Sequence, residues 1–234
     1  MKTNHKNSER FVSRVFQDVF DKYDLMNDLM SLGAHRLWKK KFINWLSPQE
    51  NSTLIDVASG TGDIARLYLE KTNFKGRVYC VDENNNMLDL SRQKIKMNSN
   101  VKWFCNNAEK LPFKNDYFDY YTISFGIRNI NNIGNALKEA YRVLKPGGRF
   151  LCLEFSKVEN EMLNKFYKIY SKSIPGIGKF IMGKSEPYKY LIDSIDKFHS
   201  QKDFFEEIKK HDFYNVSFRN LSGGIVAIHS AWKV

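Results

Sequence analysis

The 234 residues of the chain are 42% hydrophobic, which is enough to fill the core of one ordinary globular domain. The longest uncharged apolar run, at 225–232, is far shorter than the roughly 20 residues of a membrane-spanning helix, so an integral membrane protein is excluded. A formal net charge of +11 at pH 7 is compatible with nucleic acid or an anionic membrane as partner, and equally with a lysine-rich solvated surface.

The N-terminal segment, 1–47, is predicted to form a helical cap. Apolar residues recur at helical spacing over 11–23, the sequence YDLMNDLMS at 23–31 interrupts the pattern, and a second helix follows over about 37–45. Acidic residues lie among the basic ones and no apolar run is present, so the segment resembles neither a secretory signal nor a transit peptide. We therefore expect a cytoplasmic protein.

Strands and helices alternate from 48 to 155, which we expect to be the core of the domain. The predicted strands are 54–58, 77–81, 101–104, 118–124 and 149–155, and helices are predicted from about 63, after 86 and up to 144. Such alternation implies right-handed crossovers and a doubly wound, mostly parallel sheet of the Rossmann-like α/β class.

The C-terminal segment, 191–234, departs from this alternation. A helix at about 198–211 is followed by strands at 214–220 and 224–231. The three residues between these strands leave room only for a hairpin, so the last strand must run antiparallel in a sheet of seven strands. We expect residues 1–234 to form a single domain.

The first predicted strand leads into a glycine turn and then into a helix. Glycine lets a ligand approach the backbone, and the unpaired N–H groups of the following helix face the same place. Gly60, Gly62 and Ala65 also satisfy the loose fingerprint of dinucleotide-binding proteins, with Asp82 at a suitable distance. Asp56 favours a different cofactor, because a carboxylate repels a pyrophosphate and attracts the sulfonium and ammonium groups of S-adenosylmethionine (SAM). The alternative is that Asp56 only caps the turn.

Ligands of open α/β sheets bind beyond the carboxyl ends of the strands. Asp82 follows the second strand and can accept hydrogen bonds from ribose hydroxyls, and Asn107 follows the third strand and can recognise the edge of an adenine. Each of them alone is equally well explained as a turn or cap residue. The candidates at this edge are Asp56, Gly60, Thr61, Gly62, Asp82, Asn107, Ala108, Ser124, Arg128, Asn129 and Glu154.

Common catalytic and metal-binding arrangements are missing from the sequence. Methyl transfer from a sulfonium depends on holding the nucleophile in line with the methyl group and on excluding water, so no Ser-His-Asp set is needed. The five histidines are scattered, and no nucleophile elbow is present. Cys80, Cys105 and Cys152 lack metal-ligand spacing, so we expect three buried reduced thiols and no metal site.

Four segments carry further motifs: DVASGTGD at 56–63, NAEKLPF at 107–113, ISFGIRN at 123–129, and YRVLKPGGR at 141–149 with LEFS at 153–156. Together with YDLMNDLMS, they resemble the ubiquinone/menaquinone biosynthesis C-methyltransferases over nearly the whole chain. The resemblance implies a class I SAM-dependent methyltransferase that methylates a ring carbon of a polyprenyl quinol. Ser59 departs from the family, which more often has glycine there, and is expected to be tolerated if its backbone angles are ordinary.

The resemblance also implies roles for individual residues. SAM is expected to contact Thr61, Asp82, Asn107, Ala108 and Ser124. A ring carbon becomes nucleophilic when a neighbouring hydroxyl loses its proton, which a positive side chain favours. Arg128 is expected to act there with a water, supported by Asn129 and Tyr23. The alternatives are a salt bridge at the sheet edge for Arg128 and a core aromatic role for Tyr23.

Residues 156–190 are expected to form a helical lid or substrate insertion. On a helix, one broad face carries Met162, Leu163, Phe166, Tyr167, Ile169, Tyr170 and Ile174, with Lys165, Lys168 and Lys172 opposite. Such a helix suits a cover over a prenyl tail or an edge in the lipid headgroup layer, and an ordinary helix packed on the sheet is equally compatible. The sequence IPGIG at 174–178 is a candidate hinge.

Three other functions match parts of the sequence less well. The charge permits an RNA or DNA methyltransferase, but the residues after the fourth strand lack the motif of base-flipping amino methylases. Tyr141 and Lys145 match the Tyr-x-x-x-Lys pair of short-chain dehydrogenases, but Pro146 ends their helix. A purely structural subunit of a quinone-biosynthesis complex has no need of Asp82 or Arg128.

The expected partners follow from the same features. LEFS at 153–156 and the residues at 190–201 resemble the ubiquinone branch more closely, so the favoured substrate is 2-methoxy-6-polyprenyl-1,4-benzoquinol, with demethylmenaquinol as the alternative. The sequence is compatible with peripheral contact on the inner face of the membrane, with a homodimer and with a quinone-biosynthesis complex. No nucleic acid is expected as a partner.

Overall fold

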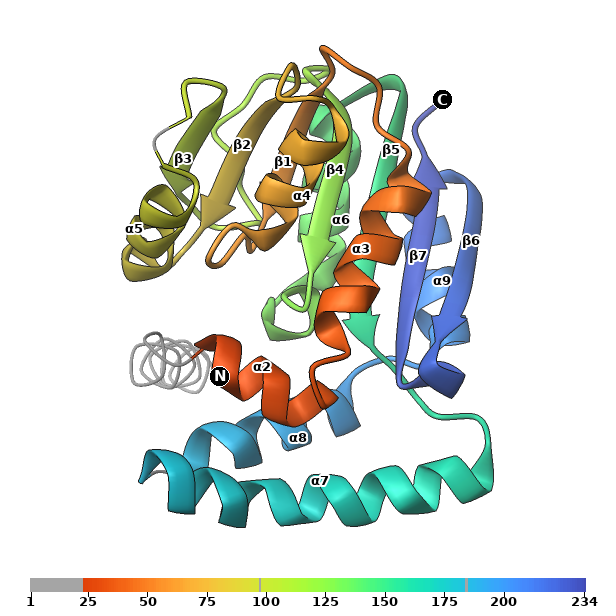
Figure 1. The fold of residues 1–234 in the computed structure, drawn as a ribbon. Helices are drawn as coiled ribbons and strands as arrows, with labels where there is room; N and C mark the ends of the chain where they lie inside the picture. The colour runs from red at the N-terminus through yellow and green to blue at the C-terminus, as the bar shows by residue number, and fades with distance from the viewer. Residues whose placement is uncertain (1–22, 97, 184) are drawn as a thin grey trace, which may run out of the picture.

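The computed structural model describes residues 23–96, 98–183 and 185–234. At its centre is one sheet with the strand order β3-β2-β1-β4-β5-β7-β6 (Figure 1). The strands are β1 (Thr53–Val57), β2 (Arg77–Asp82), β3 (Val101–Cys105), β4 (Phe118–Ser124), β5 (Leu144–Phe155), β6 (Tyr214–Leu221) and β7 (Val226–Trp232). Every residue of β1 is buried, as expected for a strand covered by helices on both sides.

Six strands run in one direction and β7 runs against them. β1 pairs in parallel with β2 and β4, β2 with β3, and β4 with β5, whereas β7 is antiparallel to both β5 and β6. The predicted doubly wound sheet with an antiparallel last strand is therefore confirmed. The carboxyl ends of β1, β2, β4 and β5 meet at one edge, which is the lower edge of the sheet in Figure 1.

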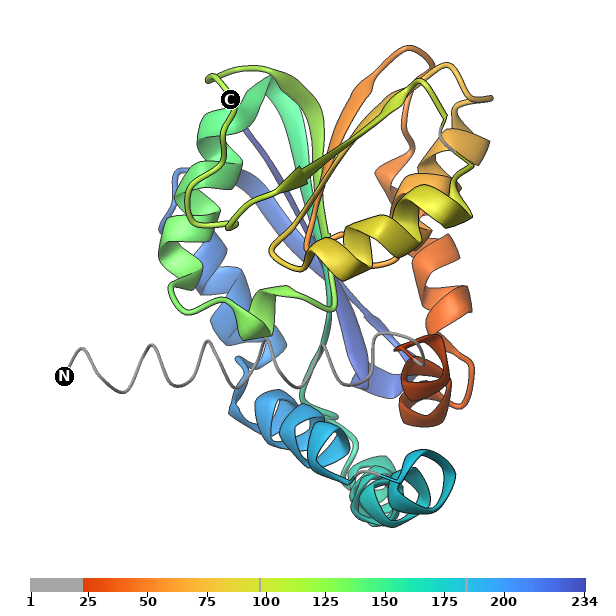
Figure 2. The same cartoon turned by 90° about the vertical axis from the view of Figure 1, so that its left-hand side faces the viewer.

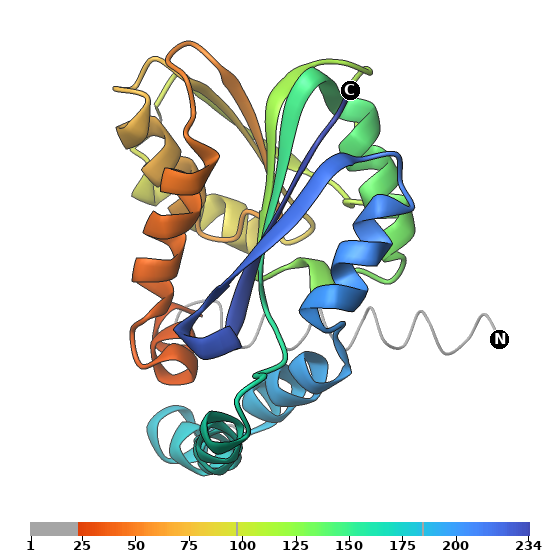
Figure 3. The same cartoon turned by 90° about the vertical axis from the view of Figure 1, so that its right-hand side faces the viewer.

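Helices cover both faces of the sheet (Figures 2 and 3). On one face lie α3 (His35–Leu46), α4 (Asp63–Lys71) and α5 (Asn85–Lys94), and on the other lie α6 (Ile133–Val143) and α9 (Gln201–Lys209). Each helix turns an apolar stripe to the sheet, as α6 does with Ala136, Leu137, Ala140 and Val143. Two apolar clusters result, one on each face of the sheet.

Three helices lie beyond the carboxyl edge: α2 (Tyr23–Ser31), α7 (Glu161–Met182) and α8 (Glu186–Lys197) (Figure 1). The Tyr170 hydroxyl of α7 donates a hydrogen bond to the backbone oxygen of Leu29 in α2. Helix α7 continues through Pro175, so residues 174–178 are helical here, and their role as a hinge stays a prediction. Packing holds the helix together there, since the neighbouring Ile174 is fully buried.

Other differences from the sequence prediction have local causes. Strand β5 begins at Leu144, because residues 145–148 form a bulge between two pairs with β4 (Phe118 with Leu144, Tyr120 with Arg149). Cys105 is exposed, although Cys80 and Cys152 are buried as expected. The reason is that β3 is an edge strand. Within the described ranges, no helix combines the length and apolarity needed to cross a bilayer.

Candidate active site

The loop after β1 carries the glycine turn at the carboxyl edge of the sheet. Ala58, Gly60 and Gly62 have positive φ angles of 50°, 53° and 84°, whereas Ser59 does not, so its backbone suits a side chain as expected. The Gly60 N–H donates a hydrogen bond to Asp82 Oδ2 at 2.8 Å, which ties the turn to the end of β2. Apart from Gly60 itself and its neighbours Ser59 and Thr61, no described residue has an atom within 4 Å of the place where a Cβ of Gly60 would stand. The backbone of the turn is therefore open to a ligand.

Asp56 lies in β1 just before this turn and is 1% exposed. The Thr122 hydroxyl of β4 donates to Asp56 Oδ1 at 2.8 Å, while Oδ2 has no partner among the described residues. Burial raises the pKa of this carboxyl to about 7, against the hydrogen bond from Thr122 and the charge of Lys39. Asp56 does not cap the turn, because its bond goes to a neighbouring strand. Its second oxygen is a buried acceptor facing a cleft.

The cleft is a pocket formed by the turn, the start of α4 and the end of β4. It is lined by Lys39, Asp56, Ala58, Ser59, Gly60, Thr61, Asp63, Ile64, Ser124 and Phe125. Three buried oxygens of these residues have no hydrogen-bond partner among the described residues: Asp56 Oδ2, Ser59 Oγ and Ser124 Oγ. Leaving a buried polar atom unpaired costs about 1–3 kcal/mol, so this pocket is complementary to a ligand that carries several polar groups.

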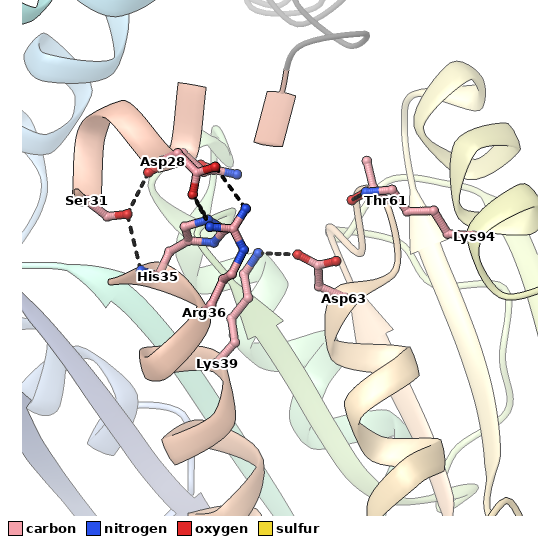
Figure 4. A network of polar contacts seen from close by, with 9 residues as sticks. Asp28, Ser31, His35, Arg36, Lys39, Thr61, Asp63 and Lys94 are labelled. Carbon is pink, nitrogen blue, oxygen red and sulfur yellow. Dashed lines mark hydrogen bonds and ion pairs between the residues drawn. The ribbon is translucent and has the colours of Figure 1, made fainter. Parts of the chain in front are cut away.

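Lys39 of α3 brings a positive charge to the same pocket (Figure 4). Its Nζ lies 2.7 Å from Asp63 Oδ2 at the start of α4, and the two side chains are 9% and 26% exposed. Burial acts to raise the pKa of Asp63, but the charge of Lys39 and its hydrogen bond outweigh burial and lower it. On the far side of the turn, Lys94 Nζ of α5 donates to Thr61 Oγ1 at 3.1 Å. With acids and a lysine side by side, the pocket suits a zwitterion.

A second group of polar contacts, one helical turn before Lys39, joins the start of α3 to α2. His35 Nε2 lies 3.0 Å from Asp28 Oδ1, and Arg36 forms an ion pair with the same carboxylate (Figure 4). Burial and then the charge of Lys39 lower the pKa of His35, which the bond to Asp28 only partly offsets. The turn between α2 and α3 is thereby fixed next to the pocket.

Sequence reasoning missed Lys39, although a signal was present. His35, Trp38, Lys39, Phe42, Ile43 and Leu46 are buried and recur at helical spacing, so they form the stripe by which α3 packs. A lysine on such a stripe is rare unless it is paired. The stripe was predictable from this spacing. The ion-pair partner of Lys39 was not, because Asp63 lies beyond the next strand in the sequence.

Asp82 and Asn107 lie farther along the carboxyl edge and outside this pocket. Asp82 Oδ1 accepts a hydrogen bond from the Asn84 N–H at 2.9 Å, and burial raises the pKa of this carboxyl. Asn107 is exposed and its Oδ1 accepts from the Glu109 N–H at 2.6 Å, whereas Ala108 is buried. Four of the predicted cofactor residues, Asp56, Gly60, Thr61 and Ser124, thus line the pocket, and Asp82, Asn107 and Ala108 lie at the ends of β2 and β3. The bond from Gly60 to Asp82 joins the two groups, whereas Gly62 lies outside the pocket lining and packs against Ser91.

Arg128 lies in a short 3-10 helix, η2 (Ile127–Asn129), directly after β4. Its Nη1 lies 2.7 Å from both Glu154 Oε1 of β5 and the Phe125 backbone oxygen, and its Nε is 3.3 Å from Ser194 Oγ of α8. Nη2 has no hydrogen-bond partner within the described ranges. The expected alternative, a salt bridge at the sheet edge, is therefore present, and sequence reasoning did not pair Glu154 and Ser194 with Arg128.

Each of the two outer helices brings a tyrosine to this end of the site. The Tyr190 hydroxyl of α8 donates to Asn129 Oδ1 at 3.0 Å. The Tyr167 hydroxyl of α7 is buried without a partner among the described residues, and burial raises its pKa to about 12, with the charge of Arg128 opposing. Tyr23 begins α2, and its side chain lies outside the described part of the structure.

The pair that matches short-chain dehydrogenases lies elsewhere. Lys145 Nζ is 2.7 Å from Asp119 Oδ1, and the Tyr141 hydroxyl donates to the backbone oxygen of Val234 at 3.4 Å. Because Lys145 is near the amino end of β5, both side chains belong to the opposite edge of the sheet. The match is a coincidence of spacing.

Comparison with known sequences agrees with the geometry of the site. The model of the ubiE/COQ5 methyltransferase family matches residues 2–233. A protein of Rickettsia bellii (strain OSU 85-389) is 52% identical over 241 residues, covering 100% of this chain and 96% of its own length. A protein of Rickettsia prowazekii (strain Madrid E) is 50% identical over 240 residues, with the same two coverages. Both bear the name ubiquinone/menaquinone biosynthesis C-methyltransferase UbiE.

Solved structures share the fold at low sequence identity. A SAM-dependent methyltransferase of Thermotoga maritima, described as a possible histamine N-methyltransferase, has a TM-score of 0.68 at 19% identity, covering 94% of this chain and 99% of its own. A phosphoethanolamine N-methyltransferase of Haemonchus contortus, solved with S-adenosyl-L-methionine, has a TM-score of 0.61 at 16% identity, covering 84% of this chain and 52% of its own. The predicted class I methyltransferase fold is thus confirmed.

Proposed function

Because the chain belongs to the ubiE/COQ5 methyltransferase family, we propose that it methylates a ring carbon of 2-methoxy-6-polyprenyl-1,4-benzoquinol. The chain is a SAM-dependent C-methyltransferase of ubiquinone/menaquinone biosynthesis. The proposal concerns which quinol it accepts and which residues act on it. The motifs that resemble the ubiquinone branch support the benzoquinol.

The observation that carries the cofactor assignment is the unpaired carboxylate oxygen of Asp56 beside the open backbone of Gly60. A carboxylate there suits the ammonium of a methionine group and repels a pyrophosphate. In this proposal Asp56, Thr61 and Ser124 hold the amino-acid end of SAM, together with Gly60 and Gly62. Asp82 takes the ribose hydroxyls, and Asn107 and Ala108 lie against the adenine.

Bound SAM supplies an electrophilic methyl group, so the protein has to orient the quinol ring and favour loss of a proton from its hydroxyl. Arg128 supports this role, because Nε and Nη1 are held by Ser194, Phe125 and Glu154 while Nη2 is left to donate. Glu154 offsets the positive charge of Arg128. The guanidinium therefore stabilises a phenolate oxygen of the substrate mainly by donating a hydrogen bond from a fixed position, and less by net charge. Asn129, held by Tyr190, and Tyr23 complete this end of the site in the proposal.

The test is turnover of two quinols by the purified protein with SAM. The benzoquinol is expected to gain one methyl group on a ring carbon, detected by mass spectrometry, and to react faster than demethylmenaquinol. Methylation of demethylmenaquinol alone overturns the choice of substrate. Binding of NADH without binding of S-adenosylhomocysteine overturns the cofactor assignment.

A further inference from the structure

Helix α7 carries a strip of exposed apolar side chains that nothing else in the described structure covers. Met162, Phe166 and Ile169 are 70%, 65% and 69% exposed. Their spacing of four and then three residues places them on one face of the helix. Contiguous exposed apolar side chains on one element indicate an interaction site, whereas scattered ones need no explanation.

The strip is not a face that packs on the body of the protein. A neighbouring face of α7 does that, with Ile174 fully buried, Tyr170 bonded to α2, and Leu163 lying against Gly223. The sequence predicted one broad apolar face, but the structure divides it into an inner half that holds the helix and an outer half in contact with solvent. The outer half therefore stays exposed while the helix is docked.

Lysines flank this outer half. Lys165, Lys168 and Lys172 are exposed, and none of them forms an ion pair with a described residue. From Glu161 to Met182 the helix has one acidic residue and four lysines. Apolar side chains bordered by lysines are typical of a helix lying in the interface of an anionic membrane. The cores of protein interfaces are instead depleted of lysine.

The position of α7 agrees with a membrane contact. The helix crosses the end of the molecule beyond the carboxyl edge of the sheet, with α8 beside it (Figure 1). On its inner side, the Tyr167 hydroxyl is buried, and the charge of Arg128 opposes the rise that burial causes in its pKa. The same helix thus has lipid-compatible side chains outside and candidate site residues inside.

We propose that the outer face of α7 binds an anionic bilayer, with Met162, Phe166 and Ile169 inserted at the level of the headgroups and Lys165, Lys168 and Lys172 on the lipid phosphates. The inference stands on this surface alone and does not depend on which quinol is the substrate. It places the Arg128 end of the molecule next to the membrane.

The test is flotation of the full chain with substrate-free vesicles of phosphatidylcholine, with and without phosphatidylglycerol. The wild type is expected to float only with the anionic vesicles. The variant F166Q/I169Q is expected to bind about tenfold less tightly, because two inserted side chains are lost. The variant K165Q/K168Q/K172Q is expected to lose the preference for phosphatidylglycerol. Equal binding to both kinds of vesicle by the wild type overturns the proposal.

A matched control uses exposed aromatic residues at the opposite edge. Phe74 and Tyr214 are 55% and 66% exposed; Phe74 lies before β2 and Tyr214 begins β6. The variant F74Q/Y214Q is expected to bind vesicles as the wild type does, and S-adenosylhomocysteine binding by calorimetry checks the fold of every variant. The proposal is overturned if the wild type does not bind vesicles and elutes as a dimer that the F166Q/I169Q substitutions convert to a monomer. The strip would then be an interface between two copies of the chain.

Discussion

The side chains of Arg128 and Glu154 form an ion pair that is almost fully buried. Arg128 Nη1 lies 2.7 Å from Glu154 Oε1, and the side chains are 4% and 2% exposed. Burial raises the pKa of Glu154, and the charge of Arg128 acts against that rise. Since both side chains are almost fully removed from solvent, each depends on the other for compensation of its charge.

Replacing Glu154→Gln is therefore expected to destabilise the protein by about 3 kcal/mol, because a buried guanidinium is left without its counter-charge. The free energy of unfolding from urea denaturation measures this. Glu50→Gln is the control, since its pair with Lys75 is exposed and contributes little. Equal stability of Glu154→Gln and the wild type contradicts the assignment of Glu154 as the charged partner.

Replacing Arg128→Lys is expected to lower kcat on the quinol about 100-fold and to leave the affinity for S-adenosylhomocysteine unchanged. Lysine keeps the charge but has no planar set of donors to hold Ser194, Glu154 and a substrate oxygen together. Steady-state kinetics and calorimetry separate the two effects. Arg92→Lys, in an exposed pair with Asp89 on α5, is the control. Loss of cofactor affinity in Arg128→Lys contradicts a role limited to the substrate.

The ligand-free protein is expected to lose stability as the pH rises, through Asp56. Burial raises the pKa of its carboxyl from 3.8 to about 7. Between these values the folded state holds a proton that the unfolded state has released, so stability falls as the pH rises through this window and stays lower above it. Asp56→Asn lacks this loss, and above pH 7 it is expected to be more stable than the wild type by about 2–4 kcal/mol. Urea denaturation below and above pH 7 measures the free energy of unfolding of both proteins. The same pH dependence in the wild type and in Asp56→Asn contradicts the prediction.

The Asp56 carboxyl is also expected to make the affinity for the cofactor rise with pH, whereas the stability of the ligand-free protein falls. As the pH rises through about 7, Asp56 ionises and pairs better with the ammonium of S-adenosylhomocysteine, so the affinity of the wild type increases. Asp56→Asn is expected to bind about tenfold more weakly near neutral pH and to show no such increase. Calorimetry at several pH values tests this. A pH-independent affinity of the wild type contradicts it.

Lys39→Gln is expected to lower the affinity for S-adenosylhomocysteine about tenfold and to leave that for 5′-methylthioadenosine unchanged. Lys39 Nζ lies in the pocket next to Asp63, and the amino-acid carboxylate of the cofactor needs a cation that methylthioadenosine does not. Lys40→Gln is the matched control, because Lys40 is the exposed neighbour on the same helix. An equal loss for both ligands points to a disturbed turn instead.

The order and direction of the strands were predictable because they depend on local signals. Apolar runs separated by helical patterns imply parallel strands, and the short link before β7 permits only an antiparallel return. The start of β5 was not predictable, since a bulge opposite Phe118 and Tyr120 has no signature in a Lys-Pro-Gly-Gly sequence. Cys105 was placed wrongly because strand pattern does not tell which strand is at an edge.

The acidic and glycine residues of the pocket were predictable from their spacing after β1, whereas the residues that complete the site come from distant segments. Lys39 reaches Asp63 from α3, and Ser194 reaches Arg128 from α8. Periodicity gave the residues that share a face of α7, but not how much of that face the body of the protein covers. The partners of the site residues and the covered part of α7 both depend on the packing of elements that are far apart in sequence.

The strand order has a consequence for synthesis of the protein. β1 has β2 on one side and β4 on the other, so its second side stays unpaired until residues up to Ser124 have left the ribosome. During that interval the nascent chain presents an apolar strand with open backbone groups, the kind of surface that promotes aggregation. Chaperone contact with the nascent chain is therefore expected to peak before β4 emerges and to fall once it has paired.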